Sequence, residues 1–269
     1  MAEEFVARSD LAERLRFARH AAIEIGDGTL DLFFDRSFGV DRKADGSVVT
    51  EADRNAEKRF RELVSEAYPD DGVLGEEFGE TAGNSGMRWI VDPIDGTASF
   101  VAGVPLYGSL VALECQGRSL VGVIHMPALA ETVFAADGLG ATHVTHGGRD
   151  EVVARVSDVE RLADSTLCVT SLDYFRASGK AGLFETLCGS ARQSRGWSDC
   201  YALLLVATGR IEAAIEPGLH PWDIAPLDVI LREAGGRLTD WTGNGGALIE
   251  NAVASNGRVH DELLAIVKP

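Results

Sequence analysis

Positive charge is scarce in this chain of 269 residues. It contains 25 Lys and Arg against 42 Asp and Glu, which gives a formal net charge of −17. Nucleic acids and anionic membranes are polyanions, so this charge disfavours both as partners. An anionic ligand would need a local positive charge to neutralise its site, and a bound metal ion is the simplest candidate.

Paired cysteines and long apolar runs are lacking as well. The four cysteines form no C-x-x-C pair, and their scatter is typical of reduced thiols, not of a disulfide framework or a zinc site. The chain is charged from Glu3 onward, unlike a signal peptide, and no apolar run is long enough to cross a bilayer. We therefore expect a cytoplasmic protein, and 45% hydrophobic residues allow it a sizeable core.

The spacing of apolar residues predicts a layered α+β or mixed α/β fold. A first helix is expected to begin near Ser9 or Asp10, and a second at Thr50, with Asp53 completing a capping box. Residues 108–144 have the alternation of an antiparallel meander. Strands and helices then alternate, with helices expected near 180–190, 199–208, 223–234 and 258–267. A weak boundary near residue 147 divides an N-terminal metal- and phosphate-binding half, 1–147, from a C-terminal half, 148–269, that completes the substrate pocket.

One loop combines two carboxylates with a tight turn. Asp92 and Asp95 flank Pro93-Ile94 after a short buried strand, and Gly96 lets the backbone approach a ligand closely. Two carboxylates this close repel each other unless a cation lies between them, and Mg²⁺ prefers such oxygens. If a helix begins after Gly96, its free N–H groups can hold phosphate. The alternative is an ordinary turn, since Asp-Pro and Asp-Gly pairs are common in turns.

For several further acidic residues, the sequence allows a structural role as well as a functional one. Glu76 and Glu77 follow a short apolar run and could be a solvated pair. Asp223 stands at a helix start and could be a simple N-cap, and Asp53 could serve only as a helix cap. The histidines have no metal-ligand spacing, and we interpret them as structural or surface residues: His125, His143, His146 and His220.

Taken together, these blocks resemble the inositol monophosphatase superfamily, whose members are magnesium-dependent, lithium-sensitive phosphatases. The matching blocks run in family order over most of the chain: Lys43, Val49–Asp53, Gly75-Glu76-Glu77, Trp89–Thr97, Trp222–Ala225 and Glu233–Gly236. The D-P-I-D-G-T hexapeptide with the downstream W-D pair is the strongest part of the match. Ser99 departs from it, because the family usually has Asn there.

The resemblance implies the metal ligands. Glu76, Asp92 and the carbonyl of Ile94 would bind one Mg²⁺. Asp92, Asp95 and Asp223 would bind a second, and the family implies two or three ions per site. It also implies inhibition by Li⁺, a homodimer, and an αβαβα sandwich as the fold.

The resemblance also implies the catalytic and phosphate-binding residues. Thr97 and Asp53 would orient and deprotonate the attacking water, and Glu76 would assist them. The backbone N–H groups of Gly96 and Thr97 would hold phosphate, with Lys43 nearby. In-line attack on phosphorus needs positioning and charge neutralisation more than covalent help, so these roles suit phosphoryl transfer to water.

The segment around Asp199 resembles the histidinol-phosphatase branch, although Ser198 stands where that branch usually has Gly. The carboxylate of Asp199, helped by Glu216, would suit the cationic end of the substrate, and Asp95 would be a further substrate-binding residue. Asp199 could instead cap a helix, and Glu216 could be a structural acid. Arg195 could form a surface ion pair or reach the ligand across a dimer interface.

These residues predict hydrolysis of L-histidinol phosphate to L-histidinol and phosphate, a step in histidine biosynthesis. The alternatives within this class are an inositol-1-phosphate phosphatase and a broad phosphatase of small phosphorylated alcohols. An extra basic cluster for a second phosphate is lacking. An alternative from another class is a non-catalytic metal-binding regulatory protein on the same fold, and the presence of Glu76, Asp95 and Thr97 argues against it.

Overall fold

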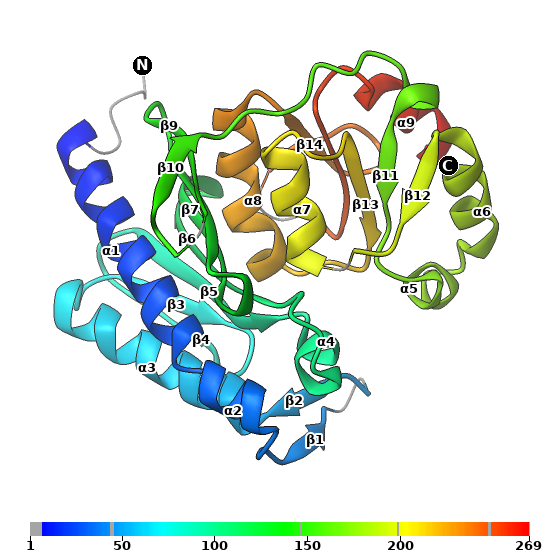
Figure 1. Ribbon diagram of the computed structural model, residues 1–269. Coiled ribbons are helices and arrows are strands. Elements are labelled where there is room, and N and C mark those ends of the chain that lie inside the picture. The colour runs from blue at the N-terminus through cyan, green and yellow to red at the C-terminus, as the bar shows by residue number, and fades with distance from the viewer. Residues whose placement is uncertain (1–6, 44–45, 146, 198, 247–248, 269) are drawn as a thin grey trace.

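The computed structural model describes residues 7–43, 46–145, 147–197, 199–246 and 249–268. Helices and sheets alternate in five layers, in the order αβαβα (Figure 1). The predicted fold class is therefore confirmed. Within the described residues, no helix is both long enough and apolar enough to cross a membrane.

Two long helices form the first layer and cover one face of the large sheet (Figure 1). Helix α1, Arg8–Asp27, begins one residue before the predicted start, after Ala7 in extended conformation. Ser9 does not cap it, because its hydroxyl donates to the carboxylate of Asp10 (3.2 Å). Helix α3, Glu51–Ala67, begins as predicted after Thr50, and its capping box with Asp53 is present.

The large sheet has eight strands in the order β10-β9-β8-β7-β6-β5-β3-β4, all antiparallel except the parallel pair β3 and β5. The strands are β3 Gly72–Gly75, β4 Gly79–Thr81, β5 Met87–Asp95, β6 Gly108–Cys115, β7 Arg118–Met126, β8 Glu131–Ala136, β9 Gly140–Thr145 and β10 Asp150–Val153. The predicted meander is formed by β6 to β9. Because β10 pairs with β9, the sheet ends at Val153, six residues beyond the division that we expected at residue 147.

The C-terminal part supplies the remaining three layers. The middle layer contains α7, Asp199–Ala207, and α8, Pro221–Ala234. Next comes a mixed sheet in the order β12-β11-β13-β15-β14, with bounds β11 Thr166–Cys168, β12 Gln193–Arg195, β13 Ala213–Pro217, β14 Arg237–Thr239 and β15 Asn251–Ser255. The outer helices are α5 Leu172–Ala177, α6 Ala181–Ser190 and α9 His260–Val267.

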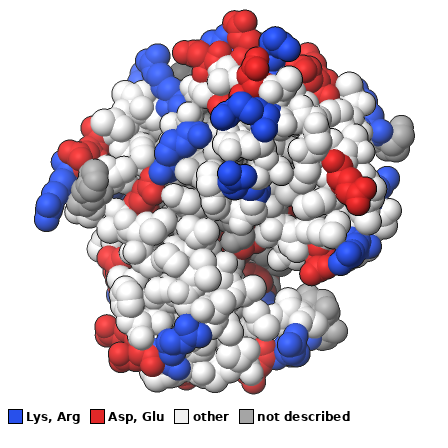
Figure 2. Space-filling model, turned by 45° about the vertical axis from the view of Figure 1, so that its right-hand side comes forward, with Lys and Arg blue, Asp and Glu red and all other residues white. Residues whose placement is uncertain are grey.

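Short elements complete the chain. They are α2 Leu30–Asp35, β1 Val40–Arg42, β2 Val48–Thr50, α4 Thr97–Ala102 and the 3₁₀ turns Pro127–Leu129 and Leu162–Asp164. Strands β1 and β2 pair as a separate antiparallel ribbon. On the face drawn in Figure 2, Lys and Arg side chains are interspersed with Asp and Glu.

Close packing of α8 on the large sheet brings the two halves together at the site. Gly122 on β7 lies under α8, and a Cβ there would overlap the carbonyl of Pro226. Only glycine lets the helix approach the strand this closely. The N-terminal turn of α8, with Asp223, is thereby brought to the end of β5 that carries Asp92 and Asp95.

Candidate active site

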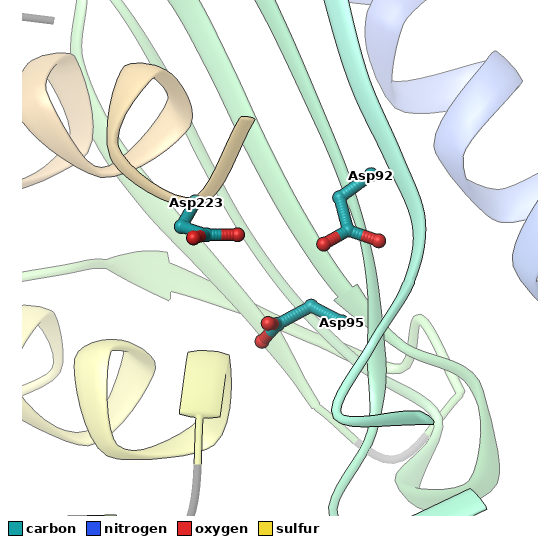
Figure 3. Close-up of side chains that lie close together, drawn as sticks. All are labelled: Asp92, Asp95 and Asp223. Atoms are coloured by element: carbon teal, nitrogen blue, oxygen red, sulfur yellow. The ribbon is translucent and has the colours of Figure 1, made fainter. Parts of the chain in front are cut away.

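Three aspartates from two distant segments converge in one place. Asp92 and Asp95 lie at the end of β5, where a register shift interrupts the pairing with β6. Asp223 lies in the first turn of α8. Each residue offers a carboxylate oxygen, and these oxygens all lie within 4.8 Å of one another. Figure 3 shows the three side chains pointing toward one another. The structure therefore brings together the aspartates that the sequence predicted as metal ligands.

Backbone amides hold each of these carboxylates in place. The amide of Ile94 donates to Asp92 (3.0 Å), and the amide of Cys200, the second residue of α7, donates to Asp95 (2.5 Å). The amide of His220 donates to Asp223 (2.8 Å), so this residue is also part of a helix cap. Each of these bonds goes to one oxygen of the carboxylate. Asp223 is therefore part of the helix cap and of the carboxylate cluster.

The electrostatics of the cluster call for a cation. Burial raises the pKa of Asp92, Asp95 and Asp223, and repulsion by neighbouring carboxylates raises each pKa further. For Asp223 the pKa rises to about 7. Within the described chain, none of the three forms an ion pair with Lys, Arg or His. A set of oxygen ligands with this much uncompensated charge fits a hard divalent cation such as Mg²⁺.

Glu76 faces the same cluster from the turn after β3. Its negative charge raises the pKa of both Asp92 and Asp223, although it is not one of the three closest residues. The ammonium of Lys43 lies 2.7 Å from a carboxylate oxygen of Glu76 and 2.7 Å from one of Glu77. Burial lowers the pKa of Lys43, but the two ion pairs outweigh it and the net pKa is raised. Lys43 is thus held beside a predicted metal ligand.

Asp53 reaches the site through Thr97. The side chain of Asp53 is fully buried, and its Oδ2 accepts hydrogen bonds from the amide (2.8 Å) and hydroxyl (2.6 Å) of Thr50. Its Oδ1 accepts from the hydroxyl of Thr97 (3.2 Å), which also contacts the carbonyl of Ile94 (3.1 Å). Burial raises the pKa of Asp53. One carboxylate therefore caps α3 and orients Thr97.

The loop between Asp95 and α4 requires glycine. Gly96 has a φ of +84°, in the left-handed region, and it is the N-cap of α4. A Cβ there would lie 3.1 Å from Oδ2 of Asp199 and 3.1 Å from the carbonyl of Leu106. The same contact shows that the carboxylate of Asp199 lies against the loop that carries Asp95.

A cavity of about 560 Å³ opens over these residues, and its walls are acidic. Six carboxylate side chains line it: Glu76, Asp92, Asp95, Asp199, Glu216 and Asp223. Among the described lining residues there is no Lys or Arg. Arg195 lies outside this lining, and its guanidinium donates to the carbonyl of Ser194 (2.8 Å). The structure thus brings Asp199 and Glu216 to the pocket, but not Arg195.

Thr170 links the two carboxylates on the substrate side. Its amide and its hydroxyl both donate to Oε1 of Glu216 (2.6 Å each), and its hydroxyl accepts from the amide of Asp199 (3.0 Å). Glu216 is 3% exposed, and burial raises its pKa to about 8. Nearby Asp199 raises that pKa as well. A cation bound beside Glu216 would lower its pKa and leave it charged.

Three aromatic residues also line the pocket, and we did not predict them as site residues. Tyr174 on α5 is one, and burial raises its pKa, with a further rise from the charge of Asp199. His220 and Trp222 stack with ring centroids 4.9 Å apart. Their position beside Asp223 in the chain could have marked these two residues, whereas nothing in the sequence marks Tyr174.

The remaining histidines differ in their surroundings. His125 is buried and bonds to Thr132 (2.8 Å), and His143 bonds to Glu131 (2.6 Å). Neither residue lines the pocket. His220 is instead part of the pocket. His146 and Ser198 lie outside the described residues.

Comparison with known proteins gives a consistent result. The sequence profile of the inositol monophosphatase family matches residues 10–268. A histidinol-phosphatase from Chlorobaculum parvum is 41% identical over 254 residues, which cover 94% of this chain and 96% of that protein. A histidinol-phosphatase from Mycobacterium tuberculosis is 41% identical over 257 residues, which cover 96% and 92%. The solved structure of extragenic suppressor protein SuhB from Bartonella henselae matches with a TM-score of 0.86 and 30% identity, over 95% of this chain and 98% of that one.

Proposed function

Because the chain belongs to the inositol monophosphatase family, we propose that it is a Mg²⁺-dependent phosphatase that hydrolyses L-histidinol phosphate. The resemblance predicted from the D-P-I-D-G-T and W-D blocks is confirmed by the family match. The relatives named histidinol-phosphatase, aligned over nearly the whole chain, support a phosphoric monoester hydrolase with this substrate.

The observation that carries the choice of substrate is the acidic wall of the pocket. Histidinol phosphate has an anionic phosphate at one end and an ammonium and an imidazole at the other. Asp199 and Glu216 lie on the side of the pocket formed by Thr170, where they would bind the cationic end. Inositol phosphate carries no positive charge, so the buried carboxylate of Glu216 and the half-buried one of Asp199 would bring no comparable gain.

The phosphate end fits the three aspartates and the Gly96 loop. Bound Mg²⁺ would lower the pKa of a water molecule and neutralise the negative charge of the phosphate. Asp92, Asp95, Asp223 and Glu76, with the carbonyl of Ile94, would hold these ions.

Thr97 and Asp53 would position the attacking water. The hydroxyl of Thr97 donates toward Asp53 and Ile94, which leaves its lone pairs free to accept a hydrogen bond from that water. The amides of Gly96 and Thr97 would donate to the phosphate, and Lys43 would lie nearby.

Steady-state kinetics on L-histidinol phosphate and inositol-1-phosphate tests this function. We expect a higher kcat/KM for histidinol phosphate with the wild type. Asp199→Asn and Glu216→Gln should each lower it by about 10- to 100-fold, since a hydrogen bond to a charged group contributes about 1.5–3 kcal/mol. Their activity on inositol-1-phosphate should change little. Equal losses on both substrates would refute the role of the acidic wall, and a wild-type preference for inositol-1-phosphate would favour the alternative function.

Glu212→Gln is a matched control for Glu216→Gln. Glu212 is also buried, directly before β13, and it accepts a hydrogen bond from the amide of Thr166 (2.6 Å), much as Glu216 accepts one from Thr170. It lies at the opposite end of β13 and does not line the pocket. The control should leave kcat/KM on both substrates within about twofold of the wild type. Inhibition by Li⁺ and a homodimeric state stay predictions from the family, and a cytoplasmic location stays a prediction from the sequence.

A further inference from the structure

A buried glutamate outside the pocket holds the turn that carries Glu76. Glu57 lies on α3, one helical turn after Asp53, and is fully buried. Its carboxylate accepts hydrogen bonds from the amide of Glu77 (2.7 Å) and from the amide of Phe78 (3.2 Å). Both amides belong to the turn between β3 and β4. Glu57 itself does not line the pocket.

The backbone around Glu76 is fixed from two sides. On one side the amide of Glu76 donates to the carbonyl of Val91 on β5 (3.3 Å). On the other side, the amides of Glu77 and Phe78 donate to the carboxylate of Glu57. Gly75 permits this arrangement, because a Cβ at that position would overlap the carboxylate of Glu57. The direction of the Glu76 side chain therefore depends on where Glu57 lies.

Arg61 completes the support. It lies four residues after Glu57 on α3, and its guanidinium contacts the Glu57 carboxylate at 2.8–2.9 Å. The same guanidinium donates to the carbonyl of Gly79 (2.5 Å) and to the hydroxyl of Thr81 (3.0 Å), both on β4. The pair thus neutralises a buried charge and connects helix α3 to the turn and to β4.

We propose that Glu57 is a positioning residue for Mg²⁺ binding: it holds the β3–β4 turn so that Glu76 faces the three aspartates. This inference rests on the proposed function, in which Glu76 is a metal ligand. Groups that orient metal ligands through hydrogen bonds typically contribute about 10- to 100-fold to metal affinity. Glu57 and Asp53 together make α3 the helix that orients both the Glu76 turn and Thr97.

Isothermal titration of the full-length protein with Mg²⁺ alone tests this role, together with thermal unfolding in EDTA. Glu57→Gln keeps the size of the side chain but removes its charge. We expect it to weaken Mg²⁺ binding by about 10- to 100-fold and to lower Tm. Wild-type affinity in Glu57→Gln would overturn the positioning role. Failure of the wild type to bind Mg²⁺ would overturn the proposed function, and the positioning role with it.

Glu114→Gln is the matched control. Glu114 is also buried, pairs with Arg88 (2.7 Å) and accepts a hydrogen bond from the amide of Gly117 in a hairpin turn. It lies opposite Arg88, at the end of β5 far from Asp92 and Asp95. It should lower Tm much as Glu57→Gln does, with Mg²⁺ affinity unchanged. An equal loss of affinity in both variants would mean that any buried glutamate matters, and would overturn the proposal.

Gly75→Ala gives an independent test should Glu57→Gln fail to fold. The added methyl group displaces the carboxylate of Glu57 without changing its charge. It should weaken Mg²⁺ binding in the wild type but have little further effect in a Glu57→Ala background, where there is nothing to displace. Additive losses in Mg²⁺ affinity would overturn the proposal.

Discussion

Removing a charge from the aspartate cluster should stabilise the metal-free protein. Burial and the nearby charges of Glu76 and Asp199 raise the pKa of Asp223 to about 7 from an ordinary value of 3.8. At 1.36 kcal/mol per pKa unit this rise corresponds to about 4 kcal/mol, and partial solvent exposure reduces it to about 1–3 kcal/mol. Asp223→Asn removes the cost of this ionisation. The asparagine oxygen can still accept the hydrogen bond from the amide of His220.

The effect should depend on pH with a definite sign. A carboxyl group whose pKa is higher in the folded state stabilises the fold below its unfolded pKa, and this contribution is lost as pH rises through the folded pKa. For Asp223 the window runs from about pH 4 to about pH 7. In EDTA at pH 8, the free energy of unfolding of Asp223→Asn should therefore exceed that of the wild type by about 1–3 kcal/mol. The difference should shrink at pH 5.

Urea denaturation at both pH values, with EDTA and with Mg²⁺, measures these differences. Mg²⁺ should stabilise the wild type by about 2.7 kcal/mol at a hundred times its Kd, and the variant by much less. Asp228→Asn, which breaks an ion pair with Arg232 on the same helix (2.9 Å), should leave the effect of Mg²⁺ unchanged. A variant that is less stable than the wild type by the same amount at pH 5 and pH 8 would refute the reasoning.

Three further substitutions test separate parts of the structure. Thr97→Val should lower kcat by about 100-fold, while the Mg²⁺ affinity measured by calorimetry stays unchanged. A kcat within threefold of the wild type would contradict the role of the Thr97 hydroxyl in positioning water. Burial lowers the pKa of His260 to about 4, so protonation of this residue alone should cost the wild type up to about 3 kcal/mol of stability as pH falls from 6.5 to 4. Over that range the free energy of unfolding of His260→Gln, measured by urea denaturation, should therefore rise relative to that of the wild type. Gly122→Ala should lower the free energy of unfolding in urea by about 1–3 kcal/mol, because the new methyl group overlaps the carbonyl of Pro226. It should also weaken Mg²⁺ binding, because α8 and Asp223 are displaced. Unchanged Mg²⁺ affinity would show that the position of Asp223 does not depend on this contact.

The local features that were predicted from the sequence depend on residues only a few positions apart in the chain. The capping box at Thr50 needs only a side chain three residues away, and the structure contains it. The turn after β5 is encoded by Pro93 and Gly96 in the same way. The gathering of Asp223 with Asp92 was predicted only through the family resemblance, since about 130 residues separate the two segments.

What could not be predicted depends on contacts between distant segments. Gly122 gave no signal of its own, and Gly75 stood only within a family block, because the need for glycine appears only when α8 or Glu57 lies beside it. Tyr174 lines the pocket because α5 follows β11 of the second sheet, and no motif marks it. The start of α1 was misplaced because Ser9 can cap a helix but bonds to Asp10 instead.

In the function that we propose, divalent cations and not basic side chains enable this acidic pocket to bind phosphate. Calorimetric titration with inorganic phosphate, first in EDTA and then in saturating Mg²⁺, tests it most directly. Since no Lys or Arg is among the described residues that line the pocket, we predict no measurable binding in EDTA and clear binding with Mg²⁺. Equal affinity for phosphate in both conditions would contradict the claim.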